Sequence, residues 1–153
     1  MNQQPTFALA IPSVSDSARL SQLSADAVPV GSMAGNFNSQ SPEFAALLFA
    51  VDEPATEDKA DYMTKPFPVK WWAAKKTELV AERSGEVTAA VRVVLVSADL
   101  KTLAFTSAGI VDSLDLIRAV KGEGPYDPAV GVTVHPVSTR SGRQMLRLRL
   151  APQ

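Results

Sequence analysis

The chain has 153 residues and a formal net charge of −1, with 46% apolar and 20% charged residues. This balance is typical of a globular protein with one core, and no apolar run approaches the roughly 18 residues of a membrane-spanning helix. The absence of cysteine excludes a disulfide framework, a thiolate nucleophile and a zinc–thiolate site. We therefore expect a soluble protein of a reducing compartment that does not bind membranes.

Charge is divided unevenly along the chain. Residues 1–64 carry two basic and eight acidic groups, a net charge of −6, whereas residues 65–153 carry thirteen basic and eight acidic groups, a net charge of +5. Such asymmetry is a hint of a nucleic-acid or membrane partner, or of an acidic arm that folds back on a basic surface. The alternative is chance segregation of solvated charges.

Residues 1–64 are predicted to form an acidic N-terminal extension rich in Ser, Ala and Pro. The segment 15–27 has the pattern of a short helix with Leu20 and Leu23 on one face, followed by loop. A second helix is favoured from Ser41, which suits the N-cap position, although a strand fits the same short apolar segment nearly as well. The polar segment 52–61 is predicted to be a linker to a barrel domain over residues 65–153.

From residue 65 onward, strand patterns alternate with turns. We predict strands over 69–81, 87–97 and 102–107, a helix over 107–122, and strands over 130–137 and 144–150. In the helix, Ile110, Leu114 and Ile117 share one face. An order of three strands, one helix and two strands matches an OB-fold. We therefore expect a mainly β protein, an OB-like five-stranded barrel with one helix between strands 3 and 4, plus the N-terminal extension.

Residue types that support catalysis or metal binding are scarce. His135 is the only histidine, and a partly exposed strand position explains it more simply than a catalytic role. There is no Gly-rich phosphate loop and no nucleophile elbow. Asp112 and Asp115 fall on the polar face of the predicted helix, where solvation explains them. We therefore predict no enzyme activity, no catalytic residue, no metal and no cofactor.

Positive charge is concentrated near the C-terminus. In the last predicted strand the leucines project to one face, whereas Arg147 and Arg149 project to the other. The turn before this strand adds Arg140 and Arg143, and no acidic residue follows Asp127. Four arginines on one hairpin and strand form a track that suits a phosphate backbone. The alternative is a solvated outer face without a partner.

The two tryptophans of the chain are adjacent, in the lysine-rich stretch KPFPVKWWAAKK over residues 65–76. On a strand, Trp71 and Trp72 point to opposite faces, so one is expected in the core and the other on the surface. An exposed indole is a natural platform for a nucleobase, because stacking contributes roughly 1–3 kcal/mol per base. In one alternative, both indoles are buried, one in the barrel and one under the N-terminal extension. In another, the exposed indole contacts a protein partner.

The predicted nucleic-acid site combines these charges and rings. Its expected phosphate contacts are Lys70, Lys75, Lys76, Arg92, Arg140, Arg143, Arg147 and Arg149, and its expected stacking residues are Trp71 or Trp72 with Phe105 and Tyr126. Because Arg92 interrupts an otherwise apolar strand, a buried pair with an acidic residue is an alternative there.

The stretch from about Lys70 to Leu150 resembles the small single-stranded DNA-binding proteins of phages and plasmids that are built on one OB-fold. The likeness lies in the strand order interrupted by one helix, in LAFTSAGIVDSLDLI, and in the arginine-bearing TRSGRQMLRLRL. It implies a cytoplasmic protein of a bacterial or phage-infected cell that binds single-stranded DNA, or RNA, in replication or recombination. It also implies a homo-oligomer without a cofactor. In many of these proteins an acidic tail follows the barrel, whereas here the negative charge precedes it.

The rival hypothesis is a non-catalytic structural or interaction protein, such as a phage virion or adaptor component. In that case the tryptophan pair anchors a protein interface, because Trp and Arg are enriched at binding hot spots. Oligomeric state and the response of binding to salt distinguish the two hypotheses.

Overall fold

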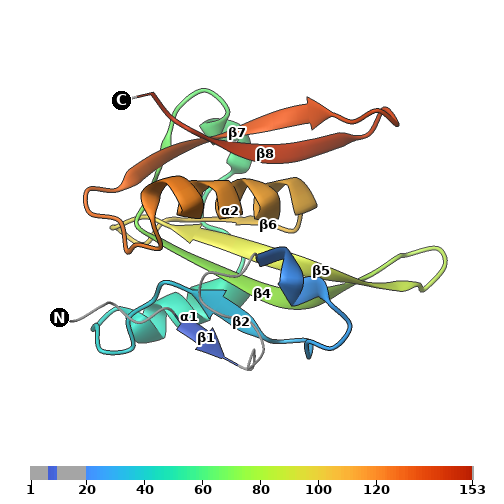
Figure 1. The fold of residues 1–153 in the computed structure, drawn as a ribbon, viewed down its shortest axis with the longest axis horizontal. Helices are drawn as coiled ribbons and strands as arrows, with labels where there is room; N and C mark the ends of the chain where they lie inside the picture. The colour runs from blue at the N-terminus through green and yellow to red at the C-terminus, as the bar shows by residue number, and fades with distance from the viewer. Residues whose placement is uncertain (1–6, 10–19, 153) are drawn as a thin grey trace.

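The structure, a computed structural model, describes residues 7–9 and 20–152 (Figure 1). Its strands are β1 (Phe7–Leu9), β2 (Met33–Gly35), β3 (Phe67–Val69), β4 (Trp71–Val80), β5 (Val87–Val96), β6 (Thr102–Phe105), β7 (Val130–Ser138) and β8 (Gln144–Leu150). Its helices are α1 (Phe44–Asp52) and α2 (Ala108–Lys121), with short 3-10 turns η1 (Leu20–Ser24) and η2 (Lys59–Tyr62). The protein is therefore mixed α/β rather than mainly β.

All described strand pairs are antiparallel, and they form two sheets. The first sheet has the order β1-β2-β4-β5-β6 and the second has the order β3-β7-β8. Only Lys70 separates β3 from β4, so the chain passes from one sheet into the other at this residue. Its backbone secures the bend, because the Lys70 N–H donates to the Val96 carbonyl and the Lys70 carbonyl accepts from the Tyr126 N–H.

The predicted five-stranded barrel does not close, and the prediction is wrong in this respect. In the described part of the chain, β6 and β8 share no ladder and both sheets remain open. Helix α2 lies between the second sheet and β6 in Figure 1, and it packs so closely on β8 that a Cβ at Gly109 would collide with the Leu146 carbonyl oxygen. The helix thus occupies the place where those two strands would have to meet. The predicted strands, helix and strands occur in the predicted order, except that the single strand expected over 69–81 is divided into β3 and β4.

The main core lies between the sheets and α2. The face predicted for the helix is confirmed, because Ile110, Leu114 and Ile117 are all buried. Leu20 and Leu23, which were predicted to share one face of a short helix, lie in the 3-10 turn η1 and are both buried in this core. Residues 15–19 of the predicted first helix lie outside the described residues.

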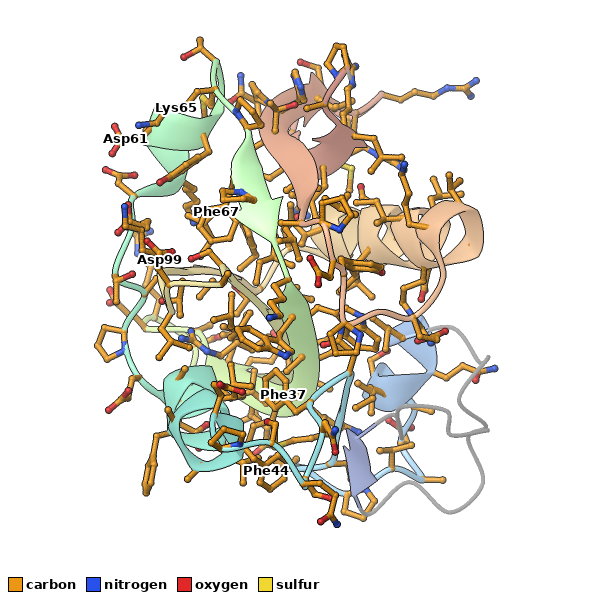
Figure 2. All side chains as sticks on the ribbon, turned by 90° about the vertical axis from the view of Figure 1, so that its left-hand side faces the viewer. Phe37, Phe44, Asp61, Lys65, Phe67 and Asp99 are labelled. Atoms are coloured by element: carbon orange, nitrogen blue, oxygen red, sulfur yellow. The ribbon has the colours of Figure 1, made fainter. Side chains whose placement is uncertain are left out.

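A second, smaller core covers the opposite face of β4 and β5. The apolar segment after Ser41, for which the sequence allowed a helix or a strand, forms helix α1. The helix begins at Phe44 with Glu43 rather than Ser41 at the N-cap position, and its Leu47 and Val51 are buried in this core. Phe37 joins them, and Figure 2 shows it beside α1. The predicted extension therefore contributes both a helix and strand β2 to the surroundings of β4.

The predicted linker, residues 52–61, runs along the outer edge of β6. Thr56 and Thr102 exchange hydrogen bonds between backbone N–H groups and side-chain hydroxyls, and the Glu57 N–H donates to the Thr102 carbonyl. This edge strand is thereby covered by the chain's own backbone. Among the residues described, no helix is long and apolar enough to cross a membrane.

Candidate nucleic-acid interface

The two tryptophans lie on a strand and point to opposite faces, as predicted, but neither is exposed. Trp71 is 4% exposed in the smaller core and Trp72 is 0% exposed in the main core. The prediction of one exposed indole is wrong because α1 and Phe37 cover the outer face of β4. The alternative in which the barrel side buries one ring and the N-terminal extension buries the other is confirmed.

Trp72 belongs to a polar network at the C-terminal end of α2. Its Nε1 donates to the Glu123 carbonyl at 2.9 Å, and the Arg118 guanidinium lies 4.7 Å from its ring centre. Arg118 is also paired with Asp115 at 2.9 Å and with the Glu123 carboxylate at 3.0 Å. Asp115 is therefore part of a partly buried ion pair with the buried Arg118, and its interpretation as a solvated surface group is wrong.

The other two predicted stacking residues are also buried. Phe105 is 2% exposed because it shares the inward face of β6 with Leu103. Tyr126 is 6% exposed, and its hydroxyl donates to the Gly122 carbonyl at 2.6 Å. Burial, together with the nearby Glu123 carboxylate, raises the pKa of Tyr126 to about 12. The described surface therefore lacks the aromatic platform that the sequence predicted.

Lys76 is a structural residue rather than a phosphate contact. Its side chain is buried, and Nζ donates to the carbonyl oxygens of Ala25 at 2.7 Å and Val28 at 2.8 Å. Buried ammonium groups need such acceptors to offset the loss of water. The prediction that Lys76 faces a ligand is wrong because the turn after η1 closes over it.

Two further lysines already have partners within the chain. Lys75 forms an ion pair with Asp52 at 2.7 Å, which links β4 to the end of α1. Lys70 is half-buried, with Nζ 4.7 Å from the centre of the Trp71 ring. A phosphate would have to compete with both contacts, so neither lysine forms part of a free basic surface.

Arg92 stabilises the C-terminal end of α1. Its Nε donates to the Val51 carbonyl and its Nη2 to the Glu53 carbonyl, both at 2.8 Å. A cation suits this position, because the last carbonyls of a helix lack partners and carry partial negative charge. Both predictions for Arg92, a phosphate contact and a pair with an acid, are wrong, since its acceptors are backbone carbonyls.

The remaining four predicted residues lie together on β7, β8 and the turn between them, a unit we term the basic hairpin. Arg140, Arg143 and Arg149 are exposed, and Arg147 is half-buried beside Gly109 of α2. None of the four forms an ion pair with any residue that the structure describes. The predicted arginine track is therefore the part of the site that the structure brings together.

Strand register places two further polar residues beside these arginines. His135 on β7 lies opposite Arg147, and Thr133 lies opposite Arg149. The Thr133 hydroxyl and His135 Nε2 are 2.8 Å apart. This association of Thr133 and His135 with the arginines was not predicted from the sequence, although the alternation of valines in 130–137 indicates which residues face outward.

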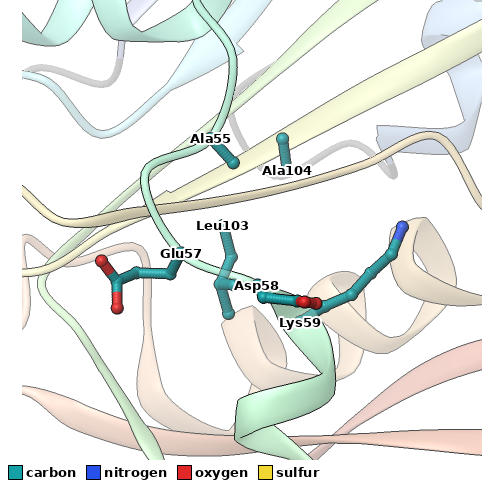
Figure 3. A pocket seen from close by; sticks show the side chains of 6 residues that line it. All are labelled: Ala55, Glu57, Asp58, Lys59, Leu103 and Ala104. Atoms are coloured by element: carbon teal, nitrogen blue, oxygen red, sulfur yellow. The ribbon is translucent and has the colours of Figure 1, made fainter.

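A pocket of about 290 Å³ lies at the edge of β6, lined by Ala55, Glu57, Asp58, Lys59, Leu103 and Ala104. Figure 3 shows the Glu57 side chain directed away from Asp58 and Lys59. Its carboxylate accepts from the Tyr62 hydroxyl at 2.9 Å. Nowhere in the described ranges do three or more His, Cys, Asp or Glu side chains gather to hold a metal. This pocket therefore offers no convergent reactive groups, and the basic hairpin remains the candidate site.

No family model, curated protein or solved structure matches the chain. The candidate site therefore rests on the charge, exposure and register of the basic hairpin.

Proposed function

We propose that the protein binds single-stranded nucleic acid, DNA or RNA, through its phosphates and with little sequence preference. The observation that supports this proposal is the basic hairpin, where four arginines occur without an acidic partner among the described residues. A guanidinium presents a planar fork of N–H donors that matches phosphate oxygens. The hairpin therefore has the chemistry to contact a nucleic-acid backbone.

The strand arrangement supports an open OB-like domain. When β3 and β4 are taken as one strand bent at Lys70, the order becomes bent strand, β5, β6, α2, β7, β8. This is five strands with the helix between the third and the fourth, as in OB-folds that bind oligonucleotides. An open barrel of this kind is consistent with a ligand that follows an outer face.

The buried aromatic rings change the expected binding mode. Trp71, Trp72, Phe105 and Tyr126 are all less than a tenth exposed, so base stacking on these rings does not contribute. Arg147 and Arg149 project from alternate positions of β8, about 6.6 Å apart along the strand. A flexible single strand can adjust its backbone to meet both charges. Binding should therefore depend on salt and hardly on base composition.

The test is a titration of labelled thirty-base oligonucleotides at several salt concentrations. Four phosphate contacts predict a slope of about −3 for the logarithm of the binding constant against the logarithm of salt concentration. Replacing Arg140, Arg143, Arg147 and Arg149 together by Gln should remove most of this slope and weaken binding at low salt by at least about tenfold. Arg83→Gln, on the exposed β4–β5 turn, is the matched control and should bind like the wild type.

A flat salt response, or equal binding by the fourfold variant, would contradict the proposal. The same titration with duplex DNA of equal length is the second control. Weaker binding of the duplex would indicate a preference for single strands, whereas equal binding would indicate a general attraction to polyanions. Tryptophan emission should change little on binding, since both rings are buried.

A second candidate function is a non-catalytic structural or interaction component. It is favoured by the exposed apolar side chains of Leu79, Val80 and Val87, which have no role in the contact of nucleic acid with the basic hairpin. In that case oligonucleotides would not bind even at low salt, while self-association or binding to another protein would remain.

A further inference from the structure

The outer halves of β4 and β5, residues 77–90, form a hairpin that we term the β-arm. It extends beyond the rest of the first sheet at the right of Figure 1. Leu79, Val80 and Val87 on this arm are 46%, 64% and 53% exposed. Because Leu79 lies on one face and the Val80–Val87 pair on the other, the arm presents apolar surface on both faces.

One edge of the β-arm lacks a strand partner within the described residues. β5 pairs with β4 over its whole length, 87–96, but it pairs with β6 only over 93–96. The Ala81 N–H donates to the Glu86 carbonyl, so Glu86 is directed toward β4. The alternation of antiparallel ladders then directs the backbone N–H and C=O groups of Val87, Ala89 and Val91 away from β4.

This edge also lacks the features that normally prevent edge pairing. Natural edge strands carry Lys, Pro or a bulge at such positions, whereas 87–91 reads VTAAV. A groove of about 280 Å³ lies beside it, lined in part by Ala89, Val91, Ala108 and Val111. The free edge and the groove together form an apolar surface suited to an additional strand.

We infer that this edge pairs antiparallel with the same edge of a second copy of the chain, about a two-fold axis at Ala89. In this register Val87 lies opposite Val91 of the second copy, and Ala89 lies opposite its own counterpart. The outward-directed N–H and C=O groups of Val87, Ala89 and Val91 in each copy then all find partners in the other copy, which gives about six backbone hydrogen bonds between the two chains. The contact is isologous, as in most homodimers.

Charge complementarity supports a second copy as the occupant. The register that centres on Ala89 places Glu86 opposite Arg92 of the second copy. Arg92 Nε and Nη2 already donate to the carbonyls of Val51 and Glu53, but its positive charge has no carboxylate partner among the described residues. Glu86 of the second copy would supply that opposite charge, and opposite charges across strands stabilise a ladder. The central Ala89 pair is small, so the two backbones can approach without a side-chain clash. No like charges meet between residues 86 and 92. The strand is thus complementary to itself in both shape and charge.

The test is the oligomeric state of the full chain, measured by sedimentation equilibrium over a range of concentrations. Ala89→Pro removes the N–H that would bond to the second copy, while β4 does not use that N–H. Ala89→Ser keeps both the N–H and the small side chain and is the matched control. We expect the wild type and A89S to dimerise, and the dimer dissociation constant of A89P to rise at least about tenfold, equivalent to 1.4 kcal/mol. Far-UV circular dichroism checks that A89P is folded.

A cross-linking experiment tests the register without relying on A89P. The chain has no cysteine, so Ala89→Cys should form a disulfide-linked dimer with its own counterpart under mild oxidation. Ala98→Cys, on the exposed turn after β5, should not. A wild type that stays monomeric, a folded A89P that dimerises as tightly as the wild type, or equal cross-linking of A89C and A98C would overturn the inference. Oligonucleotide titrations report on the basic hairpin instead, so the two proposals can fail separately.

Discussion

Lys76 places an ammonium group where the turn after η1 packs against β4. It is 4% exposed, and its acceptors, the carbonyls of Ala25 and Val28, lie 51 and 48 residues earlier in the chain. Hydrogen bonds to charged groups contribute more to stability than neutral ones. Lys76 therefore links the turn after η1 to strand β4 and stabilises their contact.

Replacing Lys76 by Met should lower the free energy of unfolding by about 2–3 kcal/mol, because two carbonyl groups lose a charged donor. Urea denaturation of the full chain measures this change. Lys75→Met is the matched control on the neighbouring residue, and it should cost less than about 1 kcal/mol, because the Lys75–Asp52 pair is partly exposed. Equal losses for both variants would contradict the structural role of Lys76.

At the level of elements, the contact between α2 and β8 joins the helix to the second sheet. Gly109 lies in the first turn of α2, directly against the backbone of Leu146. The Ser107 hydroxyl, just before the helix, donates to the same Leu146 carbonyl at 3.3 Å. The start of the helix is therefore held against the strand that carries Arg147 and Arg149.

Gly109→Ala should destabilise the protein, although alanine normally favours a helix over glycine by up to about 1 kcal/mol. The added methyl group would collide with the Leu146 carbonyl oxygen, so β8 or α2 must shift, at a cost of about 1–3 kcal/mol. Thermal unfolding measures the change. The reverse substitution at an exposed helix position, Ala119→Gly, shows the ordinary preference and should lower stability by about 1 kcal/mol. A stabilised G109A would show that the helix does not approach β8 so closely.

At the scale of the molecule, the described residues form two apolar cores on opposite faces of one sheet. β4 and β5 contribute to both, with Trp72 and Leu95 on one face and Trp71 and Val94 on the other. The face that carries Trp71 and Val94 is covered by α1 and Phe37, which belong to residues 1–64. The stability of the barrel domain proposed from the sequence thus depends on the preceding extension.

A fragment of residues 65–153 should therefore fail to fold stably as a soluble monomer. Without α1 and Phe37, Trp71, Val94 and Val96 would be exposed on a sheet face, and contiguous apolar patches of this kind promote aggregation. The soluble fraction after expression and the binding of a dye specific for apolar surfaces, each compared with the full chain, test this expectation. A fragment with the same unfolding temperature as the full chain would show that the extension is dispensable.

Much of the secondary structure could be predicted because local periodicity encodes it. The alternating leucines of β8 and the face formed by Ile110, Leu114 and Ile117 follow from side-chain geometry within a single strand or helix. The same geometry correctly placed Trp71 and Trp72 on opposite faces of a strand. The concentration of arginines on the last hairpin was equally visible, since all four lie within ten residues of one another.

What covers each face was decided only by the tertiary structure. The acceptors of Lys76 and Arg92, and the side chains that cover Trp71, come from segments 20 or more residues away in the chain. Periodicity shows that a side chain points out of a strand, but it does not show whether another segment lies over it. Burial and hydrogen bonding depend on contacts between distant segments, which a local pattern of residues does not specify. For that reason the sequence alone determined the order of the strands after residue 69 and the basic hairpin, whereas tertiary packing added β1 and β2 to the first sheet and determined which aromatic and basic side chains remain on the surface.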